Sequence, residues 1–131
     1  MKPIRILLAD DHTVVRKGLR LLLEMQAGFS VIADAADGRE ALLAARQHRP
    51  DLILMDLDMP ILDGRGAMRA LAGDPRTFKI PIIVLTAHAQ PEEVAEAAAN
   101  GCVAYETKPI ALKRLLERIQ EVLGPAPGQT D

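Results

Sequence analysis

The stretch DLILMDLDMPILDG, residues 51–64, joins an apolar run to a group of acids. The run at 52–55 shows no alternation of polar and apolar side chains, which is typical of a strand buried on both faces of a parallel sheet. Asp56 and Asp58 follow this run, and a turn signal closes the stretch. Because burial of an unpaired carboxylate is costly, an acid at the end of such a strand indicates a cation or hydrogen-bond donors close by.

Four further apolar runs, rich in Ile, Val and Leu, alternate with amphipathic helical patterns along the chain. The predicted strands are 4–9, 29–33, 52–55, 80–86 and 102–106, and the predicted helices are 13–26, 38–48, 64–71, 92–100 and 112–123. Asp37 is the expected N-cap of the second helix. This alternation predicts an α/β fold: a doubly wound, five-stranded parallel sheet with helices on both faces.

Length and composition limit the classes of function. The 131 residues suit one domain, expected at 1–124 and followed by a flexible tail at 125–131. A formal net charge of -2, with two Phe and one Tyr, argues against nucleic-acid binding. The single cysteine excludes an internal disulfide, and no apolar run approaches the ~20 residues of a membrane span. We therefore expect a cytoplasmic protein that binds neither nucleic acid nor membrane.

Five polar residues follow or end four of the predicted strands. Asp10 and Asp11 come directly after the first strand, Asp56 after the third, Thr86 at the end of the fourth and Lys108 after the fifth. Parallel strands end at one edge of their sheet, and ligands of open α/β sheets bind at that edge. We therefore expect these side chains to lie together.

The charges of this group indicate a metal. Three crowded carboxylates repel one another, and one of them would take up a proton unless cations intervened. A divalent ion together with Lys108 balances their charge, and a set of oxygen ligands favours Mg²⁺, with Mn²⁺ as a substitute. A carboxylate beside such an ion can act as a nucleophile and form an aspartyl-phosphate.

Four motifs resemble those of response-regulator receiver domains of two-component signalling, the CheY-like family. They are LLADDH at 7–12, LILMDLDMPILDG at 52–64, IVLTAH at 83–88 and YETKP at 105–109, and the resemblance extends over 4–123. It implies the flavodoxin-like strand order 2-1-3-4-5. It also implies that the domain turns over no external substrate.

The resemblance assigns a role to each site residue. It implies that Asp56 is the phosphoacceptor, with Thr86 and Lys108 binding the phosphoryl group. The implied metal ligands are Asp10, Asp11, Asp56 and the backbone carbonyl of Asp58. Tyr105 matches an aromatic residue that changes rotamer together with Thr86, and the Lys108-Pro109 bond is expected to be cis. Asp58 and His88 are expected to flank the entrance of the site, and we hypothesise that both modulate the lifetime of the phosphoryl group.

The implied partners are a sensor histidine kinase or a histidine phosphotransfer protein, and an output protein. The surface formed by the fourth helix, fifth strand and fifth helix is expected to bind the output protein. The fourth helix has one large apolar residue, Val94, and should therefore move easily. We expect a monomer or a weak, phosphorylation-dependent dimer.

Alternative interpretations and surface residues complete the predictions. A haloacid-dehalogenase-like phosphatase would use Asp56 as nucleophile and Asp58 as acid/base. The acid pair on the first strand, the short chain and the absence of an acidic metal cluster after Lys108 oppose it. The stretch DDHTVVRKGLRLLLE, residues 10–24, also resembles receivers that precede helix-turn-helix domains, so the chain can be part of a longer transcription factor. Arg16, Lys17 and Arg20 are interpreted as a solvated helix face.

Overall fold

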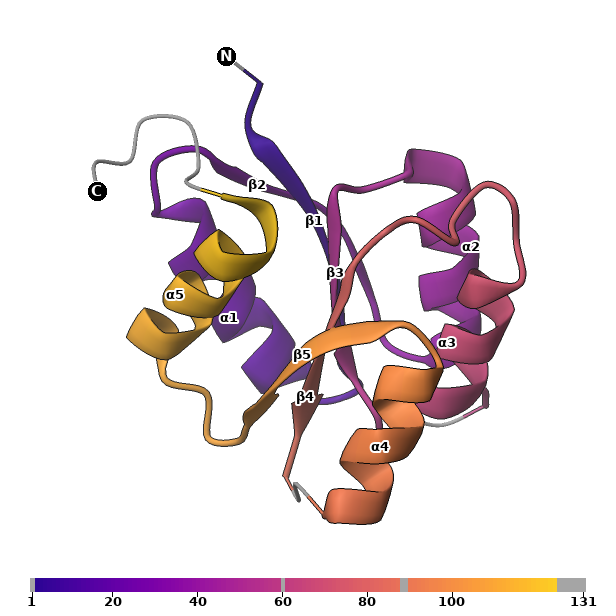
Figure 1. Ribbon diagram of the computed structural model, residues 1–131. Coiled ribbons are helices and arrows are strands. Elements are labelled where there is room, and N and C mark those ends of the chain that lie inside the picture. The colour runs from indigo at the N-terminus through magenta and orange to yellow at the C-terminus, as the bar shows by residue number, and fades with distance from the viewer. Residues whose placement is uncertain (1, 60, 88–89, 125–131) are drawn as a thin grey trace.

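Strands and helices alternate along the chain in this computed structural model, which describes residues 2–59, 61–87 and 90–124. The elements are β1 (Ile4–Ala9), α1 (Thr13–Glu24), β2 (Phe29–Ala35), α2 (Gly38–His48), β3 (Leu52–Asp56), α3 (Gly64–Ala72), β4 (Ile82–Thr86), α4 (Pro91–Ala99), β5 (Cys102–Thr107) and α5 (Leu112–Leu123) (Figure 1). The predicted sequence of five β-α units is confirmed.

The five strands form one parallel sheet in the order β2-β1-β3-β4-β5, which confirms the predicted topology. The register pairs Ala9 with Met55 and Asp56 with Leu85, so these strands end close to one level. All five residues of β3 are buried. The central strand therefore delivers its terminal carboxylate from the middle of the sheet.

Helices cover both faces of the sheet (Figure 1). On one face, Leu19 and Leu23 of α1 and Leu115 and Ile119 of α5 pack against the strands. On the other face, α2 and α3 contribute most of the buried side chains, whereas α4 contributes Ala97 as its one buried residue. Among the described residues, no helix is long and apolar enough to cross a membrane.

Four strand boundaries differ from the predictions: β3 and β5 each end one residue later, and two larger differences depend on neighbouring strands. β4 begins two residues later than expected, because Pro81 has no N–H to donate and its carbonyl instead accepts a hydrogen bond from Ile53. β2 continues two residues further, to Ala35, because Asp34 and Ala35 pair with the end of β1. Helix α1 ends at Glu24, before the predicted 26.

The start of α2 and the start of α3 both lie against the loop between β3 and α3. Asp37 caps α2 as predicted, since its Oδ1 accepts a hydrogen bond from the N–H of Glu40 at 2.8 Å. A Cβ atom on Gly38 would lie 1.7 Å from the carbonyl oxygen of Leu62, and one on Gly64 would lie 2.5 Å from that of Asp56. Backbone therefore lies directly on backbone at both positions, and the loop after Asp56 is held from two sides.

Candidate functional site

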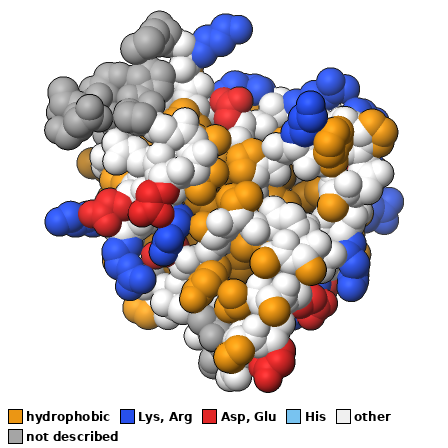
Figure 2. Space-filling model, viewed as in Figure 1, with side chains coloured by type: hydrophobic (Ala, Val, Ile, Leu, Met, Phe, Trp, Pro, Cys, Tyr) orange, Lys and Arg blue, Asp and Glu red, His pale blue; other side chains and the backbone are white. Residues whose placement is uncertain are grey.

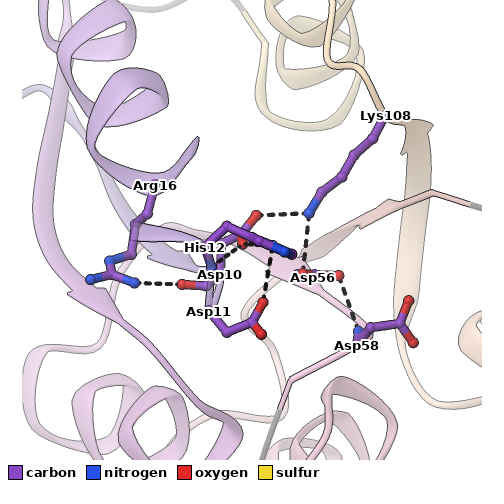
Figure 3. Close-up of polar contacts among 7 residues, drawn as sticks. All are labelled: Asp10, Asp11, His12, Arg16, Asp56, Asp58 and Lys108. Atoms are coloured by element: carbon purple, nitrogen blue, oxygen red, sulfur yellow. Dashed lines mark hydrogen bonds and ion pairs between the residues drawn. The ribbon is translucent and has the colours of Figure 1, made fainter. Parts of the chain in front are cut away.

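Acidic side chains and one lysine meet at the carboxyl edge of the sheet (Figure 3). Asp10 follows β1 and is fully buried, and Asp56 at the end of β3 is 2% exposed. The side chain of Asp11 is about one third exposed, at 31%. Lys108 approaches from the segment that follows β5. The predicted convergence of residues from separate strand ends is therefore present.

Lys108 joins the two buried carboxylates. Its Nζ donates hydrogen bonds to Asp10 Oδ2 at 2.9 Å and to Asp56 Oδ2 at 3.1 Å. Its backbone N–H donates to the carbonyl of Thr86 at 2.7 Å, and the bond to Pro109 is cis, as the resemblance implied. Burial lowers the pKa of the ammonium, but the hydrogen bonds and charges of Asp10 and Asp56 outweigh it, so the pKa of Lys108 is raised. Lys108 therefore stays protonated at neutral pH.

Asp56 is held in an environment that disfavours its charge. Burial raises the pKa of its carboxyl, and this effect exceeds the opposing hydrogen bonds from the N–H of Asp58 and from Lys108. The Asp58 N–H donates to Asp56 Oδ1 at 3.0 Å. Within the described residues each oxygen of Asp56 thus accepts a hydrogen bond, yet further positive charge would still stabilise the ionised form.

The acid cluster fits a divalent cation. Ligand atoms of Asp10, Asp11, His12 and Asp56 all lie within 4.8 Å of one another. Asp11 Oδ1 is buried and accepts no hydrogen bond from the described part of the chain, although His12 Nδ1 lies 3.2 Å away. An unsatisfied buried carboxylate oxygen beside two further carboxylates suits a hard cation such as Mg²⁺.

The other predicted site residues surround this cluster. Thr86 ends β4 and is 4% exposed. The carboxylate of Asp58 is solvent-exposed and points away from Asp56 in Figure 3, while its N–H faces Asp56. Tyr105 is half-exposed on β5. His88 lies outside the described residues.

Arg16 contacts the site, so the prediction that it belongs to a solvated helix face is wrong. Its side chain is 12% exposed, and Nη1 donates a hydrogen bond to the carbonyl oxygen of Asp10 at 2.6 Å. Arg20 forms an ion pair with Asp34 of β2, so it is also engaged. The spacing of Arg16 with buried Leu19 and Leu23 is the signal that could have placed it on the inner face.

A surface groove lies on the α4-β5-α5 face, away from the acid cluster. It has a volume of ≈ 570 Å³ and is lined by residues that include Val94, Val103, Tyr105 and Arg114. Hydrophobic side chains gather in the middle of this face (Figure 2). Arg118, which also lines the groove, donates a hydrogen bond from Nε to the buried Glu106 carboxylate at 3.1 Å. The groove thus combines apolar side chains with guanidinium groups.

Comparison with known proteins decides the family. A match to the response regulator receiver domain family covers residues 6–120. The chain belongs to this family. The predicted two-component receiver function is thereby confirmed at the level of the class, and the phosphatase alternative is not favoured. A receiver domain is a signalling domain rather than a classical enzyme.

Curated relatives of the receiver domain differ in length. It is 42% identical over 118 residues to the transcriptional regulatory protein YhcZ of Bacillus subtilis, a match that covers 89% of this chain and 54% of that protein. It is 37% identical over 124 residues to the polar-differentiation response regulator DivK of Brucella anthropi, covering 95% of this chain and 99% of DivK. The domain thus spans about half of the first relative and nearly all of the second.

A solved relative has been captured with ligands. The crystal structure of the CheX-CheY-BeF3-Mg²⁺ complex from Borrelia burgdorferi contains a chain that superposes with a TM-score of 0.85 at 25% sequence identity. The superposition covers 92% of the receiver domain and 90% of that chain.

Proposed function

We propose that Asp56 accepts a phosphoryl group from a histidine kinase or a histidine phosphotransfer protein. The observation that carries this proposal is the bridge of Lys108 Nζ between Asp56 and Asp10, at the end of the central strand. A carboxylate oxygen of Asp56 attacks the phosphorus, the P–N bond to the donor imidazole breaks, and an acyl phosphate forms. The bonding electrons stay with the imidazole, which is released from phosphorus.

A divalent cation fits beside the acceptor. Asp10, Asp11, Asp56 and the backbone carbonyl of Asp58 would hold Mg²⁺, with Mn²⁺ as a substitute. When bound, the ion offsets negative charge on the phosphoryl oxygens and on the acceptor. The unsatisfied oxygen of Asp11 and the raised pKa of Asp56 both support such a site.

Lys108 and Thr86 are the proposed ligands of the phosphoryl oxygens. Lys108 is protonated and already touches Asp56, so it can follow the charge as it moves onto the phosphoryl group. Charge-assisted hydrogen bonds contribute about 1.5–3 kcal/mol each. Two or three of them approach the ~5 kcal/mol that moves a two-state equilibrium from mostly inactive to mostly active.

The proposed output surface is the α4-β5-α5 face. Movement of Thr86 toward the phosphoryl group would be coupled to a rotamer change of Tyr105, which lines the groove on that face. An output protein would then bind there, and the domain would act in the cytoplasm as a monomer or as a weak, phosphorylation-dependent dimer. If the domain is part of a longer regulator, an attached output domain takes the place of a separate protein.

Two residues at the entrance are proposed to set the lifetime of the acyl phosphate. The N–H of Asp58 donates to the acceptor while its carboxylate is exposed, and His88 is two residues beyond Thr86 in the sequence. Decay of the phosphorylated Asp58→Ala and His88→Ala variants should differ from that of the wild type. Unchanged rates in both variants would remove this role.

Phosphorylation by acetyl phosphate tests the central proposal. Incubation with Mg²⁺ should give a hydroxylamine-labile phosphoryl group on the wild-type protein and none on Asp56→Asn. Asp51→Asn, an exposed acid at the other end of β3, is the matched control and should be phosphorylated normally. Label retained by Asp56→Asn would contradict the assignment. Robust hydrolysis of an aryl phosphate ester would instead support the phosphatase alternative.

A further inference from the structure

Arg16 of α1 approaches the acid pair, Asp10 and Asp11, from the side of α1. Its Nη1 donates a 2.6 Å hydrogen bond to the backbone carbonyl of Asp10. Its Nε is buried and makes no hydrogen bond within the described residues, but it forms an ion pair with Asp34 Oδ1 on β2 at 3.4 Å. Figure 3 shows the guanidinium of Arg16 on the opposite side of the acid pair from Lys108. Arg16 therefore touches the backbone of the pair, whereas Lys108 touches a side chain.

The two acids of the pair are held in different ways. The side chain of Asp10 is fixed by Lys108 Nζ and by the N–H of His12, which donates to Oδ1 at 2.9 Å. Asp11 has weaker support, since its buried Oδ1 accepts no hydrogen bond within the described residues. Its neighbour is the exposed ring of His12, whose Nδ1 lies 3.2 Å from Asp11 Oδ1 and 3.3 Å from Asp10 Oδ1 and is thus shared between the two acids. The direction in which Asp11 presents its carboxylate therefore depends on its backbone.

That backbone is one rigid plane. The carbonyl of Asp10 and the N–H of Asp11 belong to the same planar peptide. The preceding peptide is tied to β2, because the N–H of Asp10 donates to the carbonyl of Ala35 at 3.0 Å. Arg16 supplies the hydrogen bond on the following peptide. The plane between the two acids is thus oriented by β2 on one side and by Arg16 on the other.

The anchor of Arg16 is itself fixed. Asp34 also forms an ion pair with Arg20, one helical turn after Arg16. Arg20 Nη2 donates in addition to the carbonyl of Val31 at 3.2 Å. Two guanidinium groups on α1 thus share one carboxylate on β2, which restricts the rotamer of Arg16.

We propose that Arg16 is a positioning residue for the metal ligand Asp11. By holding the Asp10 carbonyl it orients the peptide that carries Asp11, so that the Asp11 carboxylate meets the cation with little reorganisation. This inference rests on the proposed Mg²⁺ site. Partners that orient metal ligands in this way typically change metal affinity about 10–100-fold when they are removed.

The sign of the effect separates positioning from simple electrostatics. Arg16 is positively charged, so it repels a cation bound at the acid pair. Loss of this charge alone would tighten Mg²⁺ binding. Loss of a positioning hydrogen bond would weaken it. The two roles therefore predict opposite changes in the dissociation constant.

Calorimetric titration of the unphosphorylated protein with Mg²⁺ tests the proposal. Arg16→Met keeps most of the side-chain length and should raise the Kd about tenfold or more. Lys17→Met removes the same charge from the exposed neighbouring position and should leave the Kd within about twofold of the wild type. Arg16→Lys keeps the charge but loses the planar fork, and it should also weaken binding.

Thermal unfolding of each variant is measured in parallel. If Arg16→Met does not fold, Arg16→Gln replaces it, because glutamine keeps a polar side chain beside Asp34 but removes the positive charge and the long guanidinium donor. An unchanged or lowered Kd in folded Arg16→Met, or in Arg16→Gln if that replaces it, overturns the inference even if Tm falls. Failure of the wild type to bind Mg²⁺ or to be phosphorylated on Asp56 overturns the proposed function itself, so the two failures are distinguishable.

Discussion

The carboxylate of Asp56 is ionised at a cost to the folded protein. Its burial raises its pKa, so ionisation of this carboxyl is less favourable in the native state than in the unfolded chain. We expect Asp56→Asn to raise the Tm at pH 7 without Mg²⁺ by roughly 2–5 °C, on the order of 1 kcal/mol, because the variant removes a desolvated charge. Calorimetric or circular-dichroism melts measure this directly.

The pH dependence gives this prediction its sign. The pKa of an aspartic acid in the unfolded chain is about 3.9, and the pKa of Asp56 is higher in the native state. Below the unfolded pKa both states are protonated, so wild type and Asp56→Asn should differ little. The advantage of the variant should grow above pH ~4 and level off above the native pKa. A variant that is less stable than the wild type at pH 7 would contradict the argument.

Site residues that follow a predicted strand could be identified from the sequence. Asp10, Asp56 and Lys108 could be grouped because the carboxyl ends of parallel strands share an edge. Arg16 could not, because its role depends on Asp34, whose position beside α1 follows from the pairing of β2 with β1. A charged residue on an amphipathic helix is usually exposed, and here a partner on another strand overrides that tendency.

At the scale of elements, the loop between β3 and α3 depends on close backbone contact with α2. A methyl group on Gly38 would overlap the carbonyl of Leu62, so the loop must move away from α2 or the helix must shift. We expect Gly38→Ala to lower the free energy of unfolding by about 1–3 kcal/mol and to weaken Mg²⁺ binding, since the same loop carries Asp58. Denaturant melts and calorimetry measure the two effects.

Gly18 is the matched control for Gly38. It lies inside α1, and a Cβ atom there would meet nothing within 4 Å. Gly18→Ala should therefore stabilise the protein by about 0.5–1 kcal/mol through helix propensity, with no change in Mg²⁺ affinity. Destabilisation by both substitutions would mean that steric overlap at Leu62 is not the cause.

Asp74, a second buried acid, joins α2 to the loop before β4 through Arg46. Its pKa is shifted in the opposite direction to that of Asp56. The side chain and N–H of Arg76 hydrogen-bond to Asp74 and, with Arg46 of α2, hold the pKa of its carboxyl far below the ordinary value. The ionised Asp74 stabilises the fold fully above the unfolded-state pKa of about 4, and this stabilisation is lost as the pH falls toward the lower native-state pKa. Asp74→Asn should therefore lower the Tm at pH 7, and its difference from the wild type should shrink below pH ~4. Thermal melts of both proteins between about pH 3 and pH 7 measure this difference. A Tm of Asp74→Asn that equals or exceeds that of the wild type at pH 7 would contradict the prediction.

The boundaries of elements were less predictable than their existence. All ten elements follow from periodicity and capping signals such as Asp37. The start of β4 instead depends on which donors β3 presents to Pro81, and the end of β2 on the length of β1. Such boundaries are decided by strand pairing, which a local sequence pattern does not contain.

At the scale of the whole molecule, α4 is the helix with the least apolar anchorage. Ala97 is its one buried residue, and Glu93 and Glu96 reach α3 through ion pairs with Arg65 and Arg69 at 3.4 and 3.9 Å. Exposed ion pairs of this kind contribute little. We expect a phosphate mimic such as beryllofluoride to change amide exchange in α4 and β5 while leaving α2 unchanged. Unchanged amide exchange in α4 and β5 after the mimic binds, or an equal change in α2, would contradict a switch on this face.

The bridge from Lys108 to Asp10 spans 98 residues of sequence. Synthesis must therefore pass β5 and reach Lys108 before this contact can form, and an incomplete chain lacks the assembled pocket. If Asp56 is the acceptor proposed above, its phosphorylation with the help of Lys108 therefore requires a fully synthesised and folded domain.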